Sequence, residues 1–212
     1  GFSGDQFDFY EKSSEFPLLT KVLPALRVLG QIAATYIIAE GPAGVYLIDQ
    51  HAAHERVLFE GVRGRNREPD LIVQGLIEPI SIELLPAQMQ AAEIWHATLE
   101  NYGFQGEPFG GLTFLLRGIP SPLSSNQSPE SALIDALDLL SLEQDPMQAG
   151  DSLAASIACH SAIRAGDLMA HEEMGSLLRQ LEDLDSPHTC PHGRPTMLHL
   201  STNDLEREFG RR

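Results

Sequence analysis

Apolar positions recur with the spacing of β-strands in four parts of the chain. Leu29 to Ala39 is rich in Ile, Thr and Tyr, and Val45 to Ile48 is an unbroken apolar run. Residues 80 to 84 alternate apolar and polar, and Leu112 to Leu116 is again largely apolar. These patterns predict four strands. Residues 41–44, which contain two glycines and a proline, predict a turn that joins the first two strands as a hairpin.

Helical patterns alternate with these strands. Residues from Gln50 favour helix with no breaker before Gly61. A stripe of apolar residues predicts a helix from Pro86, closed by Gly103, and Ser128 followed by proline predicts another helix start. Further helices are predicted from Asp151 or Ser152 to Gly166 and from about Ala170 to Leu184. The resulting order predicts an α/β (α+β) fold, with a strand–helix–strand–helix unit between residues 71 and 151.

Composition bounds the domain count and the partners. A chain of 212 residues with 42% hydrophobic content can form one domain or two subdomains. A net charge of −16 argues against an autonomous nucleic-acid-binding protein, which is normally basic, and no run is long enough to span a membrane. Residues 1–22 have no hydrophobic period and are expected to be a linker remnant. Because the chain begins with Gly1, we expect it to be a piece of a longer protein.

Three polar residues at the predicted strand–helix junction are candidates for metal binding. Asp49 ends the Val45 strand, and His51 and Glu55 are four residues apart, so they share one helical face. An imidazole and a carboxylate so placed can bind a divalent metal. The alternative is structural: Asp49 would cap the helix, His51 and Glu55 would be a solvated pair, and His54 would be a surface residue.

Two cysteines extend the candidate site. Cys190 and His192 lie in a segment with flanking prolines that excludes helix, and residues two apart in extended chain face the same side. Cys159 lies in the helix from residue 151, where a lone cysteine is by default a small buried hydrophobe. Two cysteines are too few for a disulfide framework; they could pair, but reduced thiols in a cytosolic protein are expected. With His51 and Glu55 they form a suitable ligand set for one zinc, leaving Asp49 for a second, harder ion.

Four motifs, taken together, resemble one family. Asp49-Gln-His-Ala followed by Glu55 and Glu60 is similar to the endonuclease signature of the MutL mismatch-repair family. Residues 190–195, Cys-Pro-His-Gly-Arg-Pro, resemble its second metal motif, and residues 209–211, Phe-Gly-Arg, its terminal Phe-x-Arg. Ala158-Cys159-His160 stands where the family usually has Ala-Cys-Arg or Ala-Cys-Lys, so Cys159 matches and His160 departs. The motifs occur in the family's order over residues 25 to 212.

The resemblance implies a C-terminal domain with two subdomains. The dimerisation subdomain would comprise residues 23–72 plus 152–212 and carry the metal site; residues 73–151 would be an inserted regulatory subdomain. The implied activity is metal-dependent nicking of one DNA strand in mismatch repair, with the two-metal logic of phosphodiester hydrolysis. The zinc-site ligands would be His51, Glu55, Cys159, Cys190 and His192. Asp49 would be the catalytic acidic residue and a metal ligand, Glu55 and Glu60 would be the signature's glutamates, zinc would be structural or regulatory, and manganese catalytic.

The resemblance also implies partners. We expect a homodimer, with the apolar segment Thr196 to Leu200 contributing to an interface, and contacts with an upstream ATPase region and the mismatch-recognition protein MutS. The location would be the bacterial cytoplasm, at the nucleoid. DNA binding by the acidic domain alone should be weak. Residues 61–69, with Arg63, Arg65 and Arg67, form either a solvated loop or a phosphate contact.

A replication sliding clamp is the expected recruiting partner. Gln74, Leu76, Ile77 and Pro79 resemble the family's clamp-binding motif, and the alternative is an ordinary edge strand ended by Pro79. Two other functions stay open: a zinc-stabilised dimerisation module without nuclease turnover, and an unrelated zinc hydrolase for a small substrate.

Overall fold

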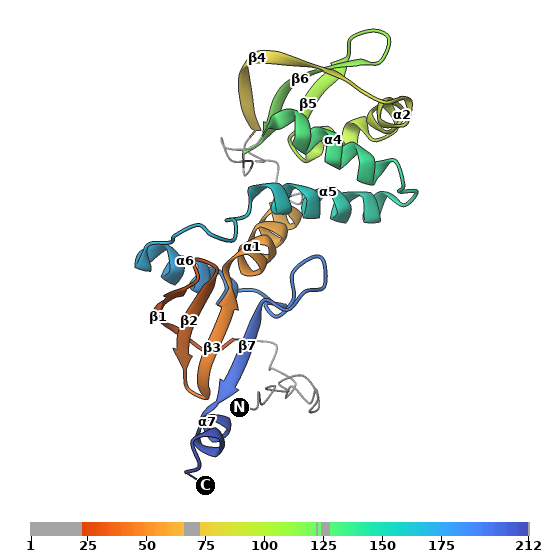
Figure 1. Cartoon of the computed structure of the whole chain (residues 1–212). Helices are drawn as coiled ribbons and strands as arrows, with labels where there is room; N and C mark the ends of the chain where they lie inside the picture. Colours follow the sequence, from red (N-terminus) through yellow and green to blue (C-terminus); the bar gives the residue numbers. More distant parts are fainter. Residues whose placement is uncertain (1–22, 66–72, 122, 124–127, 212) are drawn as a thin grey trace, which may run out of the picture.

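An antiparallel four-stranded sheet forms the lower half of the molecule in Figure 1. The computed structural model describes residues 23–65, 73–121, 123 and 128–211. The strands are β1 (Arg27–Ile32), β2 (Tyr36–Gly41), β3 (Gly44–Asp49) and β7 (Met197–Ser201), in the order β1-β2-β3-β7. The predicted hairpin is confirmed, with Gly41 paired to Gly44. The linker predicted for residues 1–22, Arg67 and the rest of 66–72 lie outside the described residues.

The single strand predicted over Leu29 to Ala39 is wrong, because a tight turn divides it into β1 and β2. Ala33 and Ala34 both have positive φ, 51° and 47°, and Thr35 N–H donates to the Ile32 carbonyl at 3.1 Å. Positive φ at both central positions suits the twist of a hairpin but normally selects Asn or Gly. Alanine gives no such signal, so the turn was invisible in the sequence. The Ala34 carbonyl is held from outside, by the N–H of Gly166 at 2.8 Å.

Helices α1 (Gln50–Arg65) and α6 (His171–Glu182) cover one face of this sheet. Every second residue of the strands turns to that face, so Ile37, Ala39, Tyr46 and Ile48 are buried with apolar residues of the two helices. Helix α6 matches the prediction closely. Helix α1 runs through Gly61 to Arg65, so Arg63 and Arg65 lie on a helix and not in the expected loop.

A second, three-stranded sheet forms the upper half. Its order is β4 (Val73–Glu83), β6 (Thr113–Pro120) and β5 (Gln105–Pro108), all antiparallel. Helices α2 (Pro86–Ile94), α3 (His96–Asn101) and α4 (Pro129–Leu140) accompany it. Helix α5 (Pro146–Ser161) packs against both α1 and α4, and α7 (Thr202–Glu208) follows β7. The mixed α/β class predicted from the sequence is therefore confirmed.

Two predicted boundaries in this half are wrong, and one strand was not predicted. The helix predicted from Pro86 to Gly103 breaks at Trp95, whose indole N–H donates to the Leu140 carbonyl at 3.1 Å. Helix α5 begins at Pro146, capped by the Asp145 carboxylate, almost two turns before the predicted caps. The short strand β5 was not predicted, because its sequence Gln-Gly-Glu-Pro has no apolar alternation.

Buried apolar residues form two clusters. The larger joins the upper sheet, α2 and α4 to α5 and to Phe59 and Val62 of α1. The smaller lies between the lower sheet, the first half of α1 and α6. Helix α1 therefore contributes to both clusters: its first half packs in the smaller cluster and its second half in the larger one. None of the helices in the described part of the chain is long and apolar enough to cross a membrane.

Candidate metal centre

An aspartate caps the N-terminus of α1 and so fixes the direction of its first side chains. One oxygen of Asp49, Oδ1, accepts hydrogen bonds from the backbone N–H of His51 at 2.9 Å and of Ala52 at 3.0 Å. These donors would otherwise lack a partner in the first turn, so Asp49 is an N-cap. The helix then places His51 and Glu55 one turn apart, with His51 Nε2 3.4 Å from Glu55 Oε1.

Glu55 is a fully buried carboxylate with one satisfied and one unsatisfied oxygen. Oε2 accepts a hydrogen bond from the Arg194 guanidinium at 3.1 Å. Oε1 is buried and has no hydrogen-bond partner among the residues that the structure describes. A buried charged oxygen without a partner is costly, so such positions are normally filled by a donor or a metal. Glu55 Oε1 therefore marks the centre of the candidate site.

The loop before β7 brings two more ligands to Glu55. Cys190 N–H donates to the Arg194 carbonyl at 2.8 Å, and Gly193, at φ 79°, donates to the Cys190 carbonyl at 2.9 Å. The sequence predicted extended chain or loop here, and the segment is a tight turn, because Gly193 permits a left-handed residue between the two prolines. The turn places Cys190, His192 and Glu55 with their ligand atoms all within 4.8 Å of one another.

The spacing of these atoms fits a shared metal ion. Glu55 Oε1 is 3.4 Å from His51 Nε2 and 3.6 Å from His192 Nδ1. Two ligand atoms held at zinc bond lengths in a tetrahedron lie roughly 3.3–3.4 Å apart. Glu55 Oε1 lies close to that separation from each imidazole, and His192 also belongs to the group whose ligand atoms all lie within 4.8 Å of one another. The donor set of thiolate, imidazole and carboxylate suits zinc better than a harder ion.

Cys159 borders the same carboxylate from α5. The residue is solvent-exposed, so the default of a buried hydrophobe is wrong. Partial desolvation of the thiol, and then the negative charge and hydrogen bond of Glu55, raise the pKa of Cys159. The metal-free site therefore favours a protonated thiol, and a cation bound there would reverse that balance. The structure thus brings Glu55, Cys190 and His192 together as one group and places His51 and Cys159 beside Glu55.

Two predicted acidic residues are placed apart from this cluster. Glu60 pairs with Arg56 at 2.6 Å. Asp49 lines a separate hollow of about 170 Å³ with residues of β2, β3 and β7. The Phe209–Arg211 segment follows α7, at the opposite end of β7 from the Cys190 turn. The described residues therefore assemble one cluster of softer ligands, and the expected set of oxygen ligands for a second ion is not part of it.

His160, the departure from the family pattern, makes an ion pair with Asp135 of α4, with 2.9 Å between Nε2 and Oδ2. His160, Cys159 and His192 share the wall of a hollow of about 530 Å³ between α4 and α5. Two of the candidate ligands, Cys159 and His192, therefore line this hollow. The His160 side chain, which stands where the family usually has Arg or Lys, is thus paired with an acidic residue of α4.

The structure adds residues that sequence reasoning missed. The Ile163 carbonyl lies 2.9 Å from His51 Nδ1, and a main-chain oxygen leaves no signal in a sequence. Gln50, fully buried, donates from Nε2 to the carbonyls of Ala34, Arg164 and Asp167. His54 is not the surface residue that was expected: its pKa is lowered, mainly by burial and then by His51. Arg194 belongs to the motif at residues 190–195, but only the structure reveals that it pairs with Glu55.

The fold and site define a mixed α/β domain with a candidate metal-ligand cluster at a strand–helix junction, in which Glu55 and Cys190 are buried and His192 is exposed. Residues 29–169 match the family described as the MutL C terminal dimerisation domain. This chain belongs to that family. The match ends before Cys190 and His192, so the second half of the ligand cluster lies beyond it.

Relatives extend the similarity over most of the chain. The DNA mismatch repair protein MutL of Symbiobacterium thermophilum is 41% identical over 199 residues, covering 90% of this chain and 31% of that protein. The MutL protein of Halothermothrix orenii is 35% identical over 90% of this chain and 30% of its own length. That of Koribacter versatilis is 36% identical over 93% of this chain and 31% of its own length. The chain spans about a third of the length of these curated relatives.

Proposed function

We propose that this chain is the metal-dependent endonuclease domain of a MutL protein and nicks one strand of duplex DNA in mismatch repair. The observation that carries the proposal is the buried Glu55: its Oε1 lies 3.4 and 3.6 Å from two imidazoles, and its carboxylate lies within 4.8 Å of the Cys190 thiol. Residues 23–72 and 152–212 form the dimerisation subdomain in this proposal, and residues 73–151 the regulatory insert. MutS and an upstream ATPase region are its proposed partners.

The chemistry of the proposed site divides between soft and hard ligands. A bound divalent ion would supply Lewis acidity and a more acidic water molecule. Cys159, Cys190, His51, His192 and Glu55 would hold zinc. Arg194 offsets the charge of Glu55 through Oε2 and leaves Oε1 for the metal. Asp49, whose Oδ1 caps α1, is the candidate for a manganese-binding carboxylate and catalytic residue, with Glu60 as the signature's second glutamate.

Asp49→Asn provides a selective test of the catalytic proposal. Asparagine caps helices as well as aspartate does, so the substitution removes the charge and preserves the cap. We expect at least a tenfold loss of manganese-dependent nicking of supercoiled plasmid, with unchanged circular dichroism. Glu93→Gln, an exposed carboxylate on α2, is the matched control and should nick normally. Normal nicking by Asp49→Asn would refute the catalytic role of this residue.

A zinc-stabilised dimerisation module without turnover is the second candidate function. It is favoured by one observation: Glu60 is committed to Arg56, and Asp49 is committed in part to the helix cap. This candidate predicts that the wild-type chain contains stoichiometric zinc but nicks no plasmid at any manganese concentration. Metal analysis alongside the nicking assay therefore separates the two functions.

We further propose that the open face of the lower sheet is the homodimer interface. Three adjacent strands place apolar residues side by side on this face, with Ile38 paired to Leu47 and Leu47 paired to Leu198. Leu198 is 46% exposed, and the neighbouring Leu200 is 50% exposed. A contiguous apolar sheet face of this kind normally packs against another element. A second copy of the chain satisfies this requirement, in keeping with a dimerisation family.

Charge introduced on this face tests the interface. Leu198→Glu with Leu200→Glu should convert the dimer to a monomer in light scattering at micromolar concentration. Leu142→Glu, an exposed leucine beyond α4, is the control and should remain dimeric. A wild-type chain with the mass of a monomer would contradict the proposal outright.

Recruitment by a sliding clamp is proposed because the acidic chain carries 30 acidic and 14 basic residues and should bind DNA weakly alone. The candidate segment lies in edge strand β4, whose pairing with β6 skips from Gly75 to Ile80. Within the skipped stretch Ile77 is fully exposed at 102%, while Leu76 packs against the core. Gln74, Ile77 and Pro79 are therefore accessible to a partner.

The clamp proposal is tested with the exposed residues of the segment. Gln74→Ala with Ile77→Ala should abolish stimulation of nicking by loaded clamp and preserve basal nicking. Ile94→Ala, which removes an isoleucine of α2 that is 62% exposed, should respond like wild type. Equal stimulation of both variants would show that this segment is an ordinary edge strand.

A further inference from the structure

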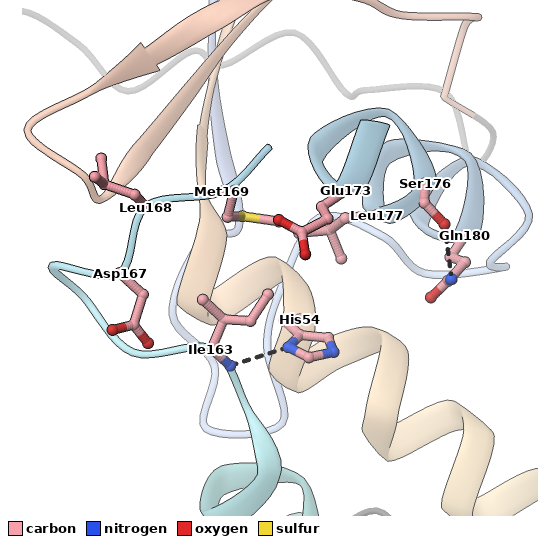
Figure 2. Close-up of a pocket in the computed structure, with 9 residues that line it drawn as sticks. All are labelled: His54, Ile163, Asp167, Leu168, Met169, Glu173, Ser176, Leu177 and Gln180. Atoms are coloured by element: carbon pink, nitrogen blue, oxygen red, sulfur yellow. Dashed lines mark hydrogen bonds between the residues drawn. The ribbon is translucent and has the colours of Figure 1, made fainter. Parts of the chain in front are cut away.

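The chain segment after α5 is held by two histidines of α1 through a single residue. The N–H of Ile163 donates to His54 Nδ1 at 3.0 Å, and the carbonyl of Ile163 lies 2.9 Å from His51 Nδ1. Figure 2 shows the His54 ring facing the Ile163 nitrogen at the start of this segment. His51 and His54 are three residues apart and so lie on neighbouring positions of one helix face.

The two hydrogen bonds assign the tautomers of both rings. A carbonyl oxygen can only accept, so His51 must carry its proton on Nδ1, which leaves the lone pair of a neutral ring on Nε2. A backbone N–H can only donate, so His54 must accept at Nδ1 and carry its proton on Nε2. His51 Nε2 is the atom 3.4 Å from Glu55 Oε1. The tautomer selected by Ile163 is therefore the one in which His51 can bind a metal at the candidate centre.

Ile163 is well placed to couple the elements of that centre. It follows Ala162, the C-terminal cap of α5, and α5 carries Cys159 in its last turn. The next residues are also attached to α1, since Gln50 Nε2 donates to the Arg164 and Asp167 carbonyls at 2.9 and 3.0 Å. A hollow of about 320 Å³ borders the segment, lined by His54, Ile163, Asp167 and residues of α6. Packing on that side is therefore incomplete, and hydrogen bonds from α1 hold the segment.

We propose that His54 is a positioning residue for the metal centre: it fixes the Ile163 peptide, and the peptide in turn fixes the tautomer and orientation of His51. This inference rests on the proposed metal-binding function of the cluster. Groups that orient a ligating histidine through its second nitrogen typically change metal affinity by about 10–100-fold when removed. His54 acts one step further out, because it orients the peptide that orients the ligand.

The test compares three variants of the 212-residue chain. His54→Leu removes the acceptor for Ile163 N–H and keeps an apolar side chain. His54→Asn keeps an acceptor near the position of Nδ1 and should rescue. His171→Leu, an exposed histidine at the start of α6, is the matched control. The first readout is the ring nitrogen shifts of His51 in metal-free protein by NMR, and the second is zinc affinity by chelator competition.

Wild type, His54→Asn and His171→Leu should show the Nδ1–H tautomer of His51. His54→Leu should show a mixture of tautomers and about a tenfold or greater loss of zinc affinity. An unchanged His51 tautomer in folded His54→Leu overturns the inference. If wild type binds no zinc, the proposed metal function fails, and the NMR readout still decides whether His54 positions His51. If His54→Leu does not fold, the tautomer and affinity of His54→Gln, which displaces the acceptor, decide in its place.

Discussion

The two halves of the molecule are stabilised by different means. Buried side chains in the upper half are almost entirely apolar and belong to one cluster that includes Leu133, Leu137 and Leu153. The lower half has a smaller apolar cluster, and beside it lie the fully buried polar residues Gln50 and Glu55. Apolar burial lowers the free energy of the fold directly, whereas buried polar groups cost free energy unless each finds a partner. The lower half therefore accepts a cost where the candidate metal centre lies.

Helix α1 shows the same contrast within one element. Its second half places Phe59 and Val62 in the upper apolar cluster, and Arg56 and Arg63 lie over the Phe59 ring at 5.6 and 5.8 Å. Its first half directs His51 and Glu55 at the ligand cluster. Apolar packing of the second half stabilises the whole helix. This stability offsets the cost of the buried polar groups that the first half holds in place. The comparison indicates that the upper half acts as a scaffold for the polar site.

The largest expected effect is on the scaffold. Leu137 of α4 is fully buried, and Leu137→Ala should lower the free energy of unfolding by about 2–5 kcal/mol, because a cavity replaces apolar contacts. Urea denaturation of metal-free protein measures the change. Leu139→Ala, on an exposed position of the same helix, should change stability by less than about 1 kcal/mol. Equal losses in both variants would show that apolar burial is not what stabilises the upper half.

Removal of metal should affect the polar half next. With zinc at about 100 times its dissociation constant, chelation should lower stability by about 2.7 kcal/mol. The matched variant is Glu55→Gln, which keeps the side chain's shape but loses the charged ligand, and it should lose most of this sensitivity to chelator. Calorimetry with and without chelator measures both. Identical chelator sensitivity in wild type and Glu55→Gln would remove Glu55 from the ligand set.

The smallest expected effect concerns the polar network behind the site. Gln50→Ala should cost about 1–3 kcal/mol, since it removes the donor to three carbonyls, those of Ala34, Arg164 and Asp167, at a buried position. Zinc affinity should fall as well, because the segment after α5 loses an attachment. Gln90→Ala, on an exposed position of α2, should be neutral in both measurements. Unchanged zinc affinity in Gln50→Ala would show that the hydrogen bonds of Gln50 do not influence the metal centre.

The sequence by itself determined the elements with strong local signals. The apolar run of β3 followed by helix formers predicted the strand–helix junction, and the cap at Ser128 with Pro129 at the first helical position predicted α4. The candidate ligands were also predictable, since cysteine, histidine and glutamate are the residue types that bind zinc. These features depend on nearest neighbours along the chain, and periodicity and composition report them well.

Only the tertiary structure decided which candidates meet. Cys159 and Cys190 approach Glu55 from a helix end and a turn distant in sequence, whereas Glu60 is drawn away by Arg56 on its own helix. The turn at Ala33 and Ala34 is another case, because both residues adopt a conformation that alanine disfavours and that contacts from other segments stabilise. Long-range packing and main-chain hydrogen bonds set these outcomes. Neither leaves a trace in the local pattern of residues, which is why the sequence could propose a ligand set but not the contacts, such as Arg194 to Glu55, that hold it.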